Sequence, residues 1–585
     1  MRFKNSPVKG RTTKELFAMS NIGSYEERVK DFDWSVAKRE LSYKEGQPIN
    51  IGYYCSDRNC ELGLGDKLAL IWEGFTGEQK RFTFNDLRIH SNSFAYLLKE
   101  KLGLKEGERV VIFMDKIPEL YFAFLGILKM GGIAMPLFSA FGEESLLTRF
   151  ESSGASAVLT TRKLVPRIRK IKDKLPHLKH VVIMSEDESI PVKEREMAFS
   201  YSKAPRVDSF KCFPSTPETP SVLHYTSGTT GQPKGALHVH NSIFSQYLTT
   251  KWVLDLTPDD IYWCTADPGW VTGTSYGIIG PWSLGITQVV LDGGFVPAKW
   301  YEFIQKHKIT VWYSAPTAIR MLMKAGREIV KKFDLSSLRH LCSVGEPLNP
   351  EAVIWSEEVY GLPFHDTWWQ TETGCILVSN YPGMKIKPGS MGKAFPGVTA
   401  AVLSHEFEPI AEKDKPGLLA LKPPWPSIFR TYWNNESGYE SKFKNGWYIT
   451  GDRSSIDEEG YFWFMGRDDD VINVAGHLVG PFEIESVLLE HEAVAESAAI
   501  GKPDAMNMEV VKAFVALKPG FEPSDDLGLE IMNFIRKKLS SIAMPQEIEF
   551  VDSLPKTRSG KIMRRVLRAQ ERGEPVGDLS TLEND

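Results

Sequence analysis

A ten-residue segment, Thr226-Ser-Gly-Thr-Thr-Gly-Gln-Pro-Lys-Gly235, combines three glycines, four hydroxyl side chains and one lysine. Glycines let backbone N–H groups come close to phosphate oxygens, hydroxyls add hydrogen-bond donors, and Lys234 adds a positive charge. The segment is not a Walker A loop, because no Gly-Lys pair follows Gly228 or Gly231 at the required spacing. A mobile surface loop rich in small polar residues is the alternative. The lysine and the dense hydroxyls favour a polyphosphate site.

A second segment, Asp366-Thr-Trp-Trp-Gln-Thr-Glu-Thr-Gly374, places two indoles beside acids and hydroxyls. Indole faces can flank a purine or close an acyl pocket, and the Glu372 carboxylate could hold Mg²⁺ against phosphates. A single tryptophan is most often a core residue, but two adjacent ones cannot both face the core from an extended segment. Three shorter candidates could line a base or a ribose: Gly345-Glu346-Pro347, Asp452 and Arg467. Taken alone, these are more typical of a turn, a solvated acid and a surface salt bridge.

The segment Pro555-Lys-Thr-Arg-Ser-Gly-Lys-Ile-Met-Arg-Arg565 places five basic residues within eleven. A nucleic-acid or lipid patch and a solvated helix start are its general interpretations. Lys561 follows a Ser-Gly turn that could carry one ammonium group into a distant phosphate site. That position favours a specific role for Lys561.

The composition limits the classes of protein that the chain can represent. Its 585 residues exceed what one hydrophobic core usually supports, so we expect at least two domains. A formal net charge of −5 gives no overall case for binding nucleic acid or an anionic membrane. Six cysteines without a C-x-x-C pair indicate neither a disulfide framework nor a zinc site, and favour a reducing, cytoplasmic setting. The first residues lack the apolar core of a signal peptide. The apolar segment 118–138 carries charges and a Gly-Gly break, so we expect a buried helix followed by a strand.

Alternating strand and helix patterns predict an α/β fold with parallel sheets. The first run has expected strands at 109–114, 132–137 and 156–160 and helices at 119–130 and 143–153. The second run has expected strands at 309–313, 338–342 and 363–366, each ending in a polar loop. Ligands gather at the carboxyl ends of parallel strands, so these loops should converge on one crevice.

The remaining patterns predict how the chain divides. Short β segments occupy 389–463, and a new unit follows with helices expected at 481–491 and 524–539 and a strand at 510–517. We therefore expect a large N-terminal domain, 1–468, of α/β layers with parallel sheets plus a small β subdomain. A smaller, mobile α+β domain is expected at 469–585, with the hinge at Asp469.

These motifs occur in the order found in acyl-adenylate-forming enzymes, and the resemblance covers nearly the whole chain. Within that superfamily the chain is most similar to the AMP-forming acetyl-CoA synthetases. The segments that carry the resemblance are Trp263-Cys-Thr-Ala-Asp-Pro-Gly-Trp-Val-Thr-Gly273, Ser343-Val-Gly-Glu-Pro347, Asp366 to Gly374 and Pro555 to Lys561. In that family a carboxylate attacks the α-phosphorus of ATP to give an acyl-adenylate and pyrophosphate. The thiol of CoA then displaces AMP.

The resemblance implies a role for each candidate residue. The residues that would hold the β- and γ-phosphates are Thr226, Ser227, Gly228, Thr229, Thr230, Gly231 and Lys234. Those that would flank adenine are Gly345, Glu346, Pro347, Asp366, Thr367 and Trp368. Gln370 and Thr371 would lie by the α-phosphate, Glu372 would hold Mg²⁺, and Asp452 and Arg467 would bind the ribose. Lys561 would stabilise charge at the α-phosphoryl group. It is also the position that a protein acetylase and a deacetylase would modify.

By the same resemblance, the C-terminal domain rotates at Asp469 between the two half-reactions. The Ala475-Gly476 loop would then face the CoA tunnel, Arg536 would contact a CoA phosphate, and Thr272 would lie near the thiol. Weaker candidates for the CoA nucleotide are Arg167 and Arg169. The residues that would set acyl size are Val271, Thr272, Val344 and Trp369. An indole at 369 favours acetate, tolerates propionate and excludes long chains.

One position departs from the family pattern. The family has Ser-Gly-His-Arg or Ser-Gly-Tyr-Arg after the hinge, whereas this chain has Ala475-Gly-His-Leu478 and lacks the arginine that contacts the AMP phosphate. Losing one charged hydrogen bond costs about 1.5 to 3 kcal/mol, enough to slow turnover or weaken AMP retention. Three functions stay open: an acetate–CoA ligase that could also run in reverse, a ligase for another small or compact acid, and a catalytically weakened nucleotide-binding regulatory protein.

Overall fold

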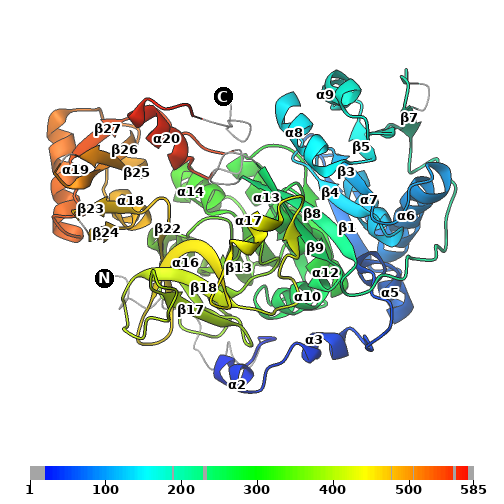
Figure 1. Ribbon diagram of the computed structural model, residues 1–585, viewed down its shortest axis with the longest axis horizontal. Coiled ribbons are helices and arrows are strands. Elements are labelled where there is room, and N and C mark those ends of the chain that lie inside the picture. Colours follow the sequence, from blue (N-terminus) through cyan, green and yellow to red (C-terminus); the bar gives the residue numbers. More distant parts are fainter. Residues whose placement is uncertain are drawn as a thin grey trace.

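The computed structural model describes residues 20–187, 190–227, 233–475, 477–504, 506–557 and 561–576. The strands of this described part form three sheets of fourteen, eight and five strands. Figure 1 shows the five-stranded sheet and its helices, in orange and red, at one end of the molecule beside the larger body formed by the rest of the chain. The predicted fold class, α/β with a large N-terminal and a smaller C-terminal part, is confirmed.

The eight-stranded sheet has the order β19-β9-β8-β4-β3-β5-β6-β7 within the described residues. Its strands are β3 (Arg109–Phe113), β4 (Ile133–Pro136), β5 (Ala157–Thr161), β6 (His180–Met184), β7 (Glu196–Phe199), β8 (Pro220–Ser227), β9 (Pro233–Val239) and β19 (Thr431–Tyr432). From β8 to β7 the pairs are parallel, as the sequence predicted for this run, while β9 pairs antiparallel with β8 and β19. The two ends of the predicted phosphate loop therefore lie on one β-hairpin.

The fourteen-stranded sheet joins a half that is parallel except for its antiparallel edge strand to a half that is antiparallel. The strands of the first half are β1 (Leu68–Glu73), β2 (Gln79–Thr83), β10 (Ile261–Cys264), β11 (Thr287–Leu291), β12 (Val311–Ser314), β13 (His340–Ser343) and β14 (Phe364–Trp368). Those of the second half are β15 (Val378–Ser379), β16 (Ser390–Ala394), β17 (Thr399–Leu403), β18 (Gly417–Lys422), β20 (Phe443–Lys444), β21 (Trp447–Ile456) and β22 (Phe462–Arg467). Strands β12, β13 and β14 are parallel neighbours, so the polar loops after them lie at one edge, as expected.

Helices cover the faces of these two sheets (Figure 1). The described helices of the larger body are α2 (Tyr25–Lys30), α3 (Ser35–Glu40), α4 (Ile51–Cys55), α5 (Asp57–Asn59), α6 (Phe84–Tyr96), α7 (Pro118–Lys129), α8 (Glu143–Ser153), α9 (Val165–Ile171), α10 (Ser242–Trp252), α11 (Val271–Thr274), α12 (Gly280–Ser283), α13 (Pro297–His307), α14 (Pro316–Ala325), α15 (Arg327–Val330), α16 (Pro350–Tyr360) and α17 (Glu436–Glu440). Helices α7 and α8 match the predicted segments within two residues at each end.

Helix α7 and strand β4 form the apolar segment 118–138, which the sequence predicted to be a buried helix followed by a strand. Every residue of α7 except Glu119 is buried, and β4 follows it directly. Lys129 is fully buried, and its ammonium pairs with Asp57 at 2.6 Å and donates to Asn92 Oδ1 at 2.7 Å. A charged group can be buried only if it is paired and hydrogen-bonded, and Lys129 has a partner of each kind. This arrangement fits a helix in the core of the protein. No helix of the described chain has the length and hydropathy needed to cross a membrane.

The C-terminal sheet has the order β24-β23-β26-β25, with β27 paired to β26. Its elements are β23 (Ile472–Val474), β24 (His477–Val479), α18 (Pro481–Leu489), β25 (Val494–Asp504), β26 (Met508–Leu517), α19 (Asp525–Lys538), β27 (Glu547–Phe550) and α20 (Arg564–Arg572). Pro481 fits the first turn of α18, where no N–H partner is needed, and the Ser524 hydroxyl caps α19 by accepting from Leu527 N at 3.2 Å. Helices α18 and α19 and strand β26 confirm the predicted segments, whereas β25 was not predicted.

Candidate active site

Asp452 is the centre of a hydrogen-bonded group of predicted site residues. Its Oδ1 accepts from Arg467 Nη1 at 2.8 Å. Its Oδ2 accepts from Trp368 Nε1 and from Gln370 Nε2, both at 3.0 Å. Asp452 is 4% exposed, and a carboxylate so buried needs both an opposite charge and hydrogen-bond donors. We call this group the Asp452 cluster; its members are Asp452, Arg467, Trp368 and Gln370.

Strand register produces the ion pair of this cluster. Asp452 on β21 lies directly opposite Arg467 on β22, so the two side chains share one face of the sheet. Gly451 has a φ of 78°, and a Cβ there would lie 2.9 Å from Arg467 Nη2. The positive φ favours glycine in the Thr-Gly-Asp motif, whereas the arginine nitrogen is the end of a flexible side chain and could shift. Burial alone would lower the pKa of Arg467, but Asp452 and Asp469 raise it overall.

A chain of hydrogen bonds connects Trp369 with the ends of three neighbouring parallel strands, β12, β13 and β14. Trp369 Nε1 donates to Tyr313 OH at 3.2 Å, and Tyr313 OH lies 2.8 Å from Thr367 Oγ1. Thr367 Oγ1 in turn donates to Ser343 O at 2.7 Å. The Trp369 indole also packs perpendicular to the Tyr276 ring, with 5.0 Å between ring centres and 83° between ring planes. Contacts from two sides therefore fix the indole that was expected to limit acyl size.

Tyr432 joins the expected metal-binding residue to the expected phosphate-binding lysine. Its hydroxyl donates to Glu372 Oε1 at 2.6 Å, and Lys234 Nζ lies 5.5 Å from the centre of its ring. Lys234 is paired across the β8–β9 hairpin with Thr226, whose Oγ1 donates to Lys234 O at 3.4 Å. The base of the predicted phosphate loop thus lies beside Glu372.

Several expected residues of the phosphate and AMP loops lie outside the described residues. These are Gly228, Thr229, Thr230, Gly231 and Gly476. Ser227 ends β8 and Leu478 pairs with Asn473 in the β23–β24 hairpin, but the structure does not describe either side chain. The departure from the family pattern at Leu478 is therefore a feature of the sequence alone.

The loop after β13 presents backbone rather than free side chains. Val344 is 6% exposed, and Gly345 has a φ of 100°, a conformation that favours glycine. The Glu346 carboxylate is held by Arg320 of α14 at 2.7 Å, and Pro347 follows it. The Glu346 side chain is therefore committed to a neighbouring helix.

Asp366 and Thr371 are tied to the same edge of the sheet. Asp366 is 6% exposed, accepts from Thr367 N at 3.0 Å, and burial raises its pKa to about 7. The Thr371 carbonyl accepts from His238 Nε2 at 2.8 Å. Both residues are therefore rigidly placed at the carboxyl end of β14.

Residues expected to meet the acyl group and CoA are dispersed. Val271 and Thr272 begin α11 and are partly buried. Arg536 is exposed on α19, and Ala475 is exposed with a φ of 50°. Two arginines of the larger body are used internally: Arg167 Nη1 donates to Ser139 O at 2.7 Å, and Arg169 pairs with Glu196 at 2.7 Å.

Lys561 is exposed in this arrangement. Its backbone N donates to Thr557 Oγ1 at 3.0 Å, and in the part of the chain that the structure describes its ammonium makes no hydrogen bond or ion pair. Arg564 pairs with Glu485 of α18 and lies within the electrostatic field of Glu346. The segment that carries Lys561 thus borders the larger body, while Lys561 itself is not joined to the Asp452 cluster.

The expected hinge is held by side chains from both directions. Asp469 lies 3.7 Å from Arg467 Nε, and its carbonyl accepts a hydrogen bond from Arg568 of α20. Asp470 also accepts from Arg568. A further contact joins the two parts of the protein, because Asn349 Nδ2 at the start of α16 donates to Ser486 Oγ of α18 at 2.9 Å.

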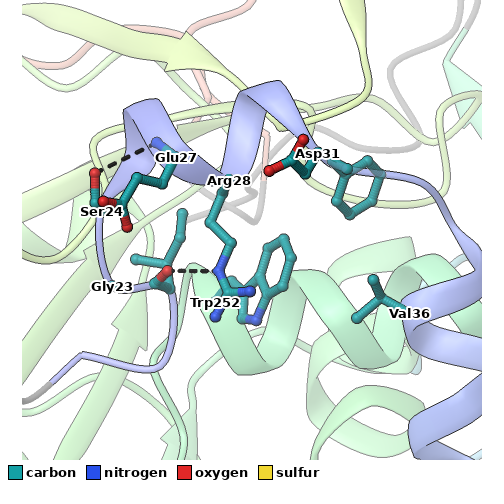
Figure 2. A pocket seen from close by; sticks show the side chains of 9 residues that line it. Gly23, Ser24, Glu27, Arg28, Asp31, Val36 and Trp252 are labelled. Atoms are coloured by element: carbon teal, nitrogen blue, oxygen red, sulfur yellow. Dashed lines mark hydrogen bonds between the residues drawn. The ribbon is translucent and has the colours of Figure 1, made fainter.

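A separate cavity of about 320 Å³ lies between α2 and the end of α10 (Figure 2). Figure 2 shows the Arg28 guanidinium over the Trp252 indole. The guanidinium carbon lies 5.0 Å from the ring centre, and Arg28 Nε donates to Ile22 O at 2.8 Å. None of the predicted site residues lines this cavity. We therefore take the candidate active site to be the Asp452 cluster with Glu372 and Lys234, and not this cavity.

Comparisons with known proteins give this geometry a family. The family model described as AMP-binding enzyme matches residues 58–433, and that described as AMP-binding enzyme C-terminal domain matches residues 483–561. The chain belongs to the AMP-binding enzyme family. It is 50% identical over 567 residues to the acetyl-coenzyme A synthetase of Bacillus subtilis, covering 96% of this chain and 98% of the relative. It is 37% identical to the acetyl-coenzyme A synthetase of Pyrobaculum aerophilum, covering 100% and 94%.

Solved structures agree with this family. An acyl-CoA synthetase of Brucella canis is 34% identical, with a TM-score of 0.73 and coverage of 94% of this chain and 99% of that one. An anthranilate CoA ligase in complex with anthranoyl-AMP is 29% identical, with a TM-score of 0.82 and coverage of 92% and 99%.

Sequence reasoning missed the aromatic residues that hold the site together. Tyr313 was placed at the end of a predicted strand, but nothing in its neighbourhood indicated a contact with Trp369 or Thr367. Tyr432 belongs to a two-residue strand without a motif. Tyr448, whose hydroxyl donates to Gln370 Oε1 at 2.9 Å, carried no signal beyond a β pattern.

Proposed function

We propose that the protein is an AMP-forming acetate–CoA ligase. The carboxylate of acetate attacks the α-phosphorus of ATP, which forms acetyl-adenylate and releases pyrophosphate. The thiol of CoA then attacks the acetyl carbon, which forms the thioester and releases AMP. The observation that supports this proposal is the hydrogen-bonded chain from Trp369 through Tyr313 to Thr367, because it would connect the expected wall of the acyl pocket to a residue expected beside the adenine. The names of the relatives in Bacillus subtilis and Pyrobaculum aerophilum support acetate as the acid.

The Asp452 cluster would bind the ribose. A carboxylate has about four lone-pair sites, and Asp452 uses three of them on Arg467, Trp368 and Gln370. One position remains for a ribose hydroxyl. Adenine would lie against Gly345 and Pro347, with Asp366, Thr367 and Trp368 on its other side. Since the Glu346 carboxylate is bound to Arg320, its backbone rather than its side chain would meet the base.

Mg²⁺ is the metal that this site fits. Glu372 Oε1 accepts from Tyr432, while among the described residues no donor reaches Glu372 Oε2. A single carboxylate with one uncommitted oxygen suits Mg²⁺, which takes few protein ligands and several phosphate oxygens. The ion would neutralise charge on the phosphates, and Gln370 and Thr371 would position the α-phosphate.

The C-terminal domain would alternate between the half-reactions by rotation at Asp469. In one orientation Lys561 would bring its charge to the α-phosphoryl group. In the other, Ala475 and Arg536 would contact CoA near Thr272. Acetylation of the exposed Lys561 by a protein acetylase, reversed by a deacetylase, would remove that charge and slow adenylation more than thioester formation.

Pyrophosphate release tests the proposal directly. The purified protein is incubated with ATP, Mg²⁺ and one of a series of acids, from acetate to hexanoate and benzoate, first without and then with CoA. We expect the highest kcat/KM with acetate, a lower value with propionate, and AMP and thioester only when CoA is present. A higher kcat/KM with another acid would reassign the substrate, and no pyrophosphate with any acid would refute the ligase.

A further inference from the structure

Tyr432 is a buried aromatic residue that contacts two of the side chains expected to bind ATP. It lies on β19, is 2% exposed, and its hydroxyl donates to Glu372 Oε1 at 2.6 Å. The Lys234 ammonium lies 5.5 Å from the centre of the same ring, within the range of a cation–π contact. Burial and the negative charge of Glu372 raise the pKa of the Tyr432 hydroxyl, so it keeps its proton and remains a donor. One side chain therefore joins the expected metal ligand to an expected phosphate ligand.

The backbone around Tyr432 is bonded to the same two regions. Phe429 N donates to the Glu372 carbonyl at 2.9 Å, and Trp433 N donates to Gly235 O at 2.7 Å. Tyr432 itself pairs with β9, the second strand of the phosphate hairpin. Its ring also packs against the Phe429 ring, with 4.8 Å between ring centres. These contacts fix the position of the Tyr432 hydroxyl relative to the Glu372 carboxylate.

A carboxylate binds a metal ion more tightly when another group already holds it in place. A free glutamate side chain samples several rotamers, and fixing one of them at the moment of binding costs entropy. Metal-binding carboxylates are in turn hydrogen-bonded, and loss of such a partner typically weakens metal binding by about 10- to 100-fold. Tyr432 holds one oxygen of Glu372, and among the described residues no donor reaches the other. This arrangement leaves one oxygen of a held carboxylate for a cation.

We propose that Tyr432 is a positioning residue for the complex of Mg²⁺ with ATP: its hydroxyl holds Glu372 for the metal, and its ring supports the Lys234 ammonium that meets the phosphates. This inference rests on the proposed ATP-dependent function. Glu372 and Lys234 must act on one ligand together, because Mg²⁺ binds phosphate oxygens as well as a carboxylate. The hydroxyl of Tyr432 therefore contributes to nucleotide binding only when the metal is present, whereas its ring contributes with or without the metal.

Calorimetry on the full chain separates these two contributions. The probe is α,β-methylene-ATP, whose α–β bridge an acid cannot displace, titrated once with saturating Mg²⁺ and once with EDTA. The ratio of the two affinities measures how much the metal assists binding, and the affinity of free nucleotide for Mg²⁺ is the same for every variant. We expect Tyr432→Phe to lower this ratio by about tenfold or more and to change the affinity in EDTA less than twofold.

Two further variants serve as comparisons. Tyr439→Phe is the matched control, because the Tyr439 ring also packs against Phe429 but, among the described residues, its hydroxyl does not contact Glu372. It should change neither the ratio nor the affinity in EDTA. Tyr432→Leu removes the ring as well as the hydroxyl, so it should also weaken binding in EDTA, by about two- to fivefold.

A double-mutant cycle separates positioning from a structural role. If Tyr432 acts through Glu372, Tyr432→Phe should lower the ratio no further in a Glu372→Gln protein, whose amide is a poor ligand for Mg²⁺. Equal loss of affinity with Mg²⁺ and with EDTA would indicate a structural role and overturn the inference. An unchanged ratio in Tyr432→Phe, or a parent protein that does not bind the nucleotide, would overturn it as well. These measurements need no turnover, so they give an answer even if no acid yields pyrophosphate with the parent protein, the result that would refute the ligase itself.

Discussion

We expect Trp369 to decide which acid is selected. Its indole is hydrogen-bonded to Tyr313 and packs perpendicular to the Tyr276 ring, and both contacts oppose a movement that would admit a longer chain. A wall fixed in this way selects by volume, and each methylene group that a pocket accepts or rejects changes binding by about 1 to 3 kcal/mol.

Trp369→Gly should therefore change the preferred acid. Removing the indole opens space beyond the acetate position, so we expect kcat/KM for acetate to fall and that for butyrate and hexanoate to rise by about tenfold or more. Competing acids assayed with the same enzyme preparation give the ratio. Trp447→Gly removes a partly buried indole from β21 and should leave the ratio unchanged. A preference for acetate that survives Trp369→Gly would show that another residue forms the wall.

At the scale of elements, the β8–β9 hairpin and the residue that follows it carry three buried histidines, and burial disfavours the charged forms of their imidazoles. Burial lowers the pKa of His224 to about 3, that of His238 to about 4 and that of His240 to about 3. In the unfolded chain these imidazoles take up protons below about pH 6.5. The unfolded state then binds more protons than the folded state, so stability is full above pH 6.5 and is lost as the pH falls toward 4.

Acid should therefore destabilise this hairpin in a measurable way. Each neutral histidine contributes a slope of about 1.4 kcal/mol per pH unit in this window. His224→Gln should reduce the slope of the unfolding free energy between pH 6.5 and 5 by about that amount, whereas the exposed His405→Gln should not. Denaturant unfolding at several pH values measures the slope. Buried carboxyl groups change the unfolding free energy in the opposite direction, but they are the same in the parent and in both variants. Their contribution therefore cancels when the slopes are compared, and identical slopes would contradict the prediction.

At the scale of the whole molecule, the contact between the two domains buries an unpaired acid. Both carboxylate oxygens of Glu351 on α16 are buried without a hydrogen-bond partner among the described residues. Burial and, to a smaller extent, Glu490 of the C-terminal part raise its pKa to about 7, although its own backbone N–H and Lys538 act to lower it. Since a separated Glu351 would ionise near pH 4.5, this domain contact is favoured in acid and weakens as the pH rises from 4.5 to 7.

Glu351→Gln should remove that pH dependence. Energy transfer between one dye on each domain reports their contact, and we expect the parent protein to lose contact between pH 5 and 7.5 while the variant stays constant. Glu358→Gln, on the same helix and paired with Arg327, is the matched control and should follow the parent. A pH profile that is the same in Glu351→Gln as in the parent would assign the titration to another group.

The sequence predicted those features whose pattern lies within one short segment of the chain. Asp452 and Gly451 belong to a motif whose residues act together, and helices such as α8 and α18 carry their own periodicity. Strand β25 was missed because its apolar run, Ala498 to Ile500, is short and is flanked by the polar residues Glu496, Ser497 and Lys502. Tyr313 and Tyr432 reach the site only through strand pairing between distant segments, which no local pattern records.

The hydrogen-bonded chain from Trp369 through Tyr313 to Thr367 has a thermodynamic consequence. The residue expected to limit the acid and a residue expected beside the base cannot shift independently, so occupation of one position changes the free energy of the other. Such coupling is reciprocal: the factor by which bound nucleotide alters affinity for an acid equals the factor by which that acid alters affinity for nucleotide. Nucleotide affinity measured in the presence of each of a series of acids would then show which acids fit the acyl pocket, without any turnover.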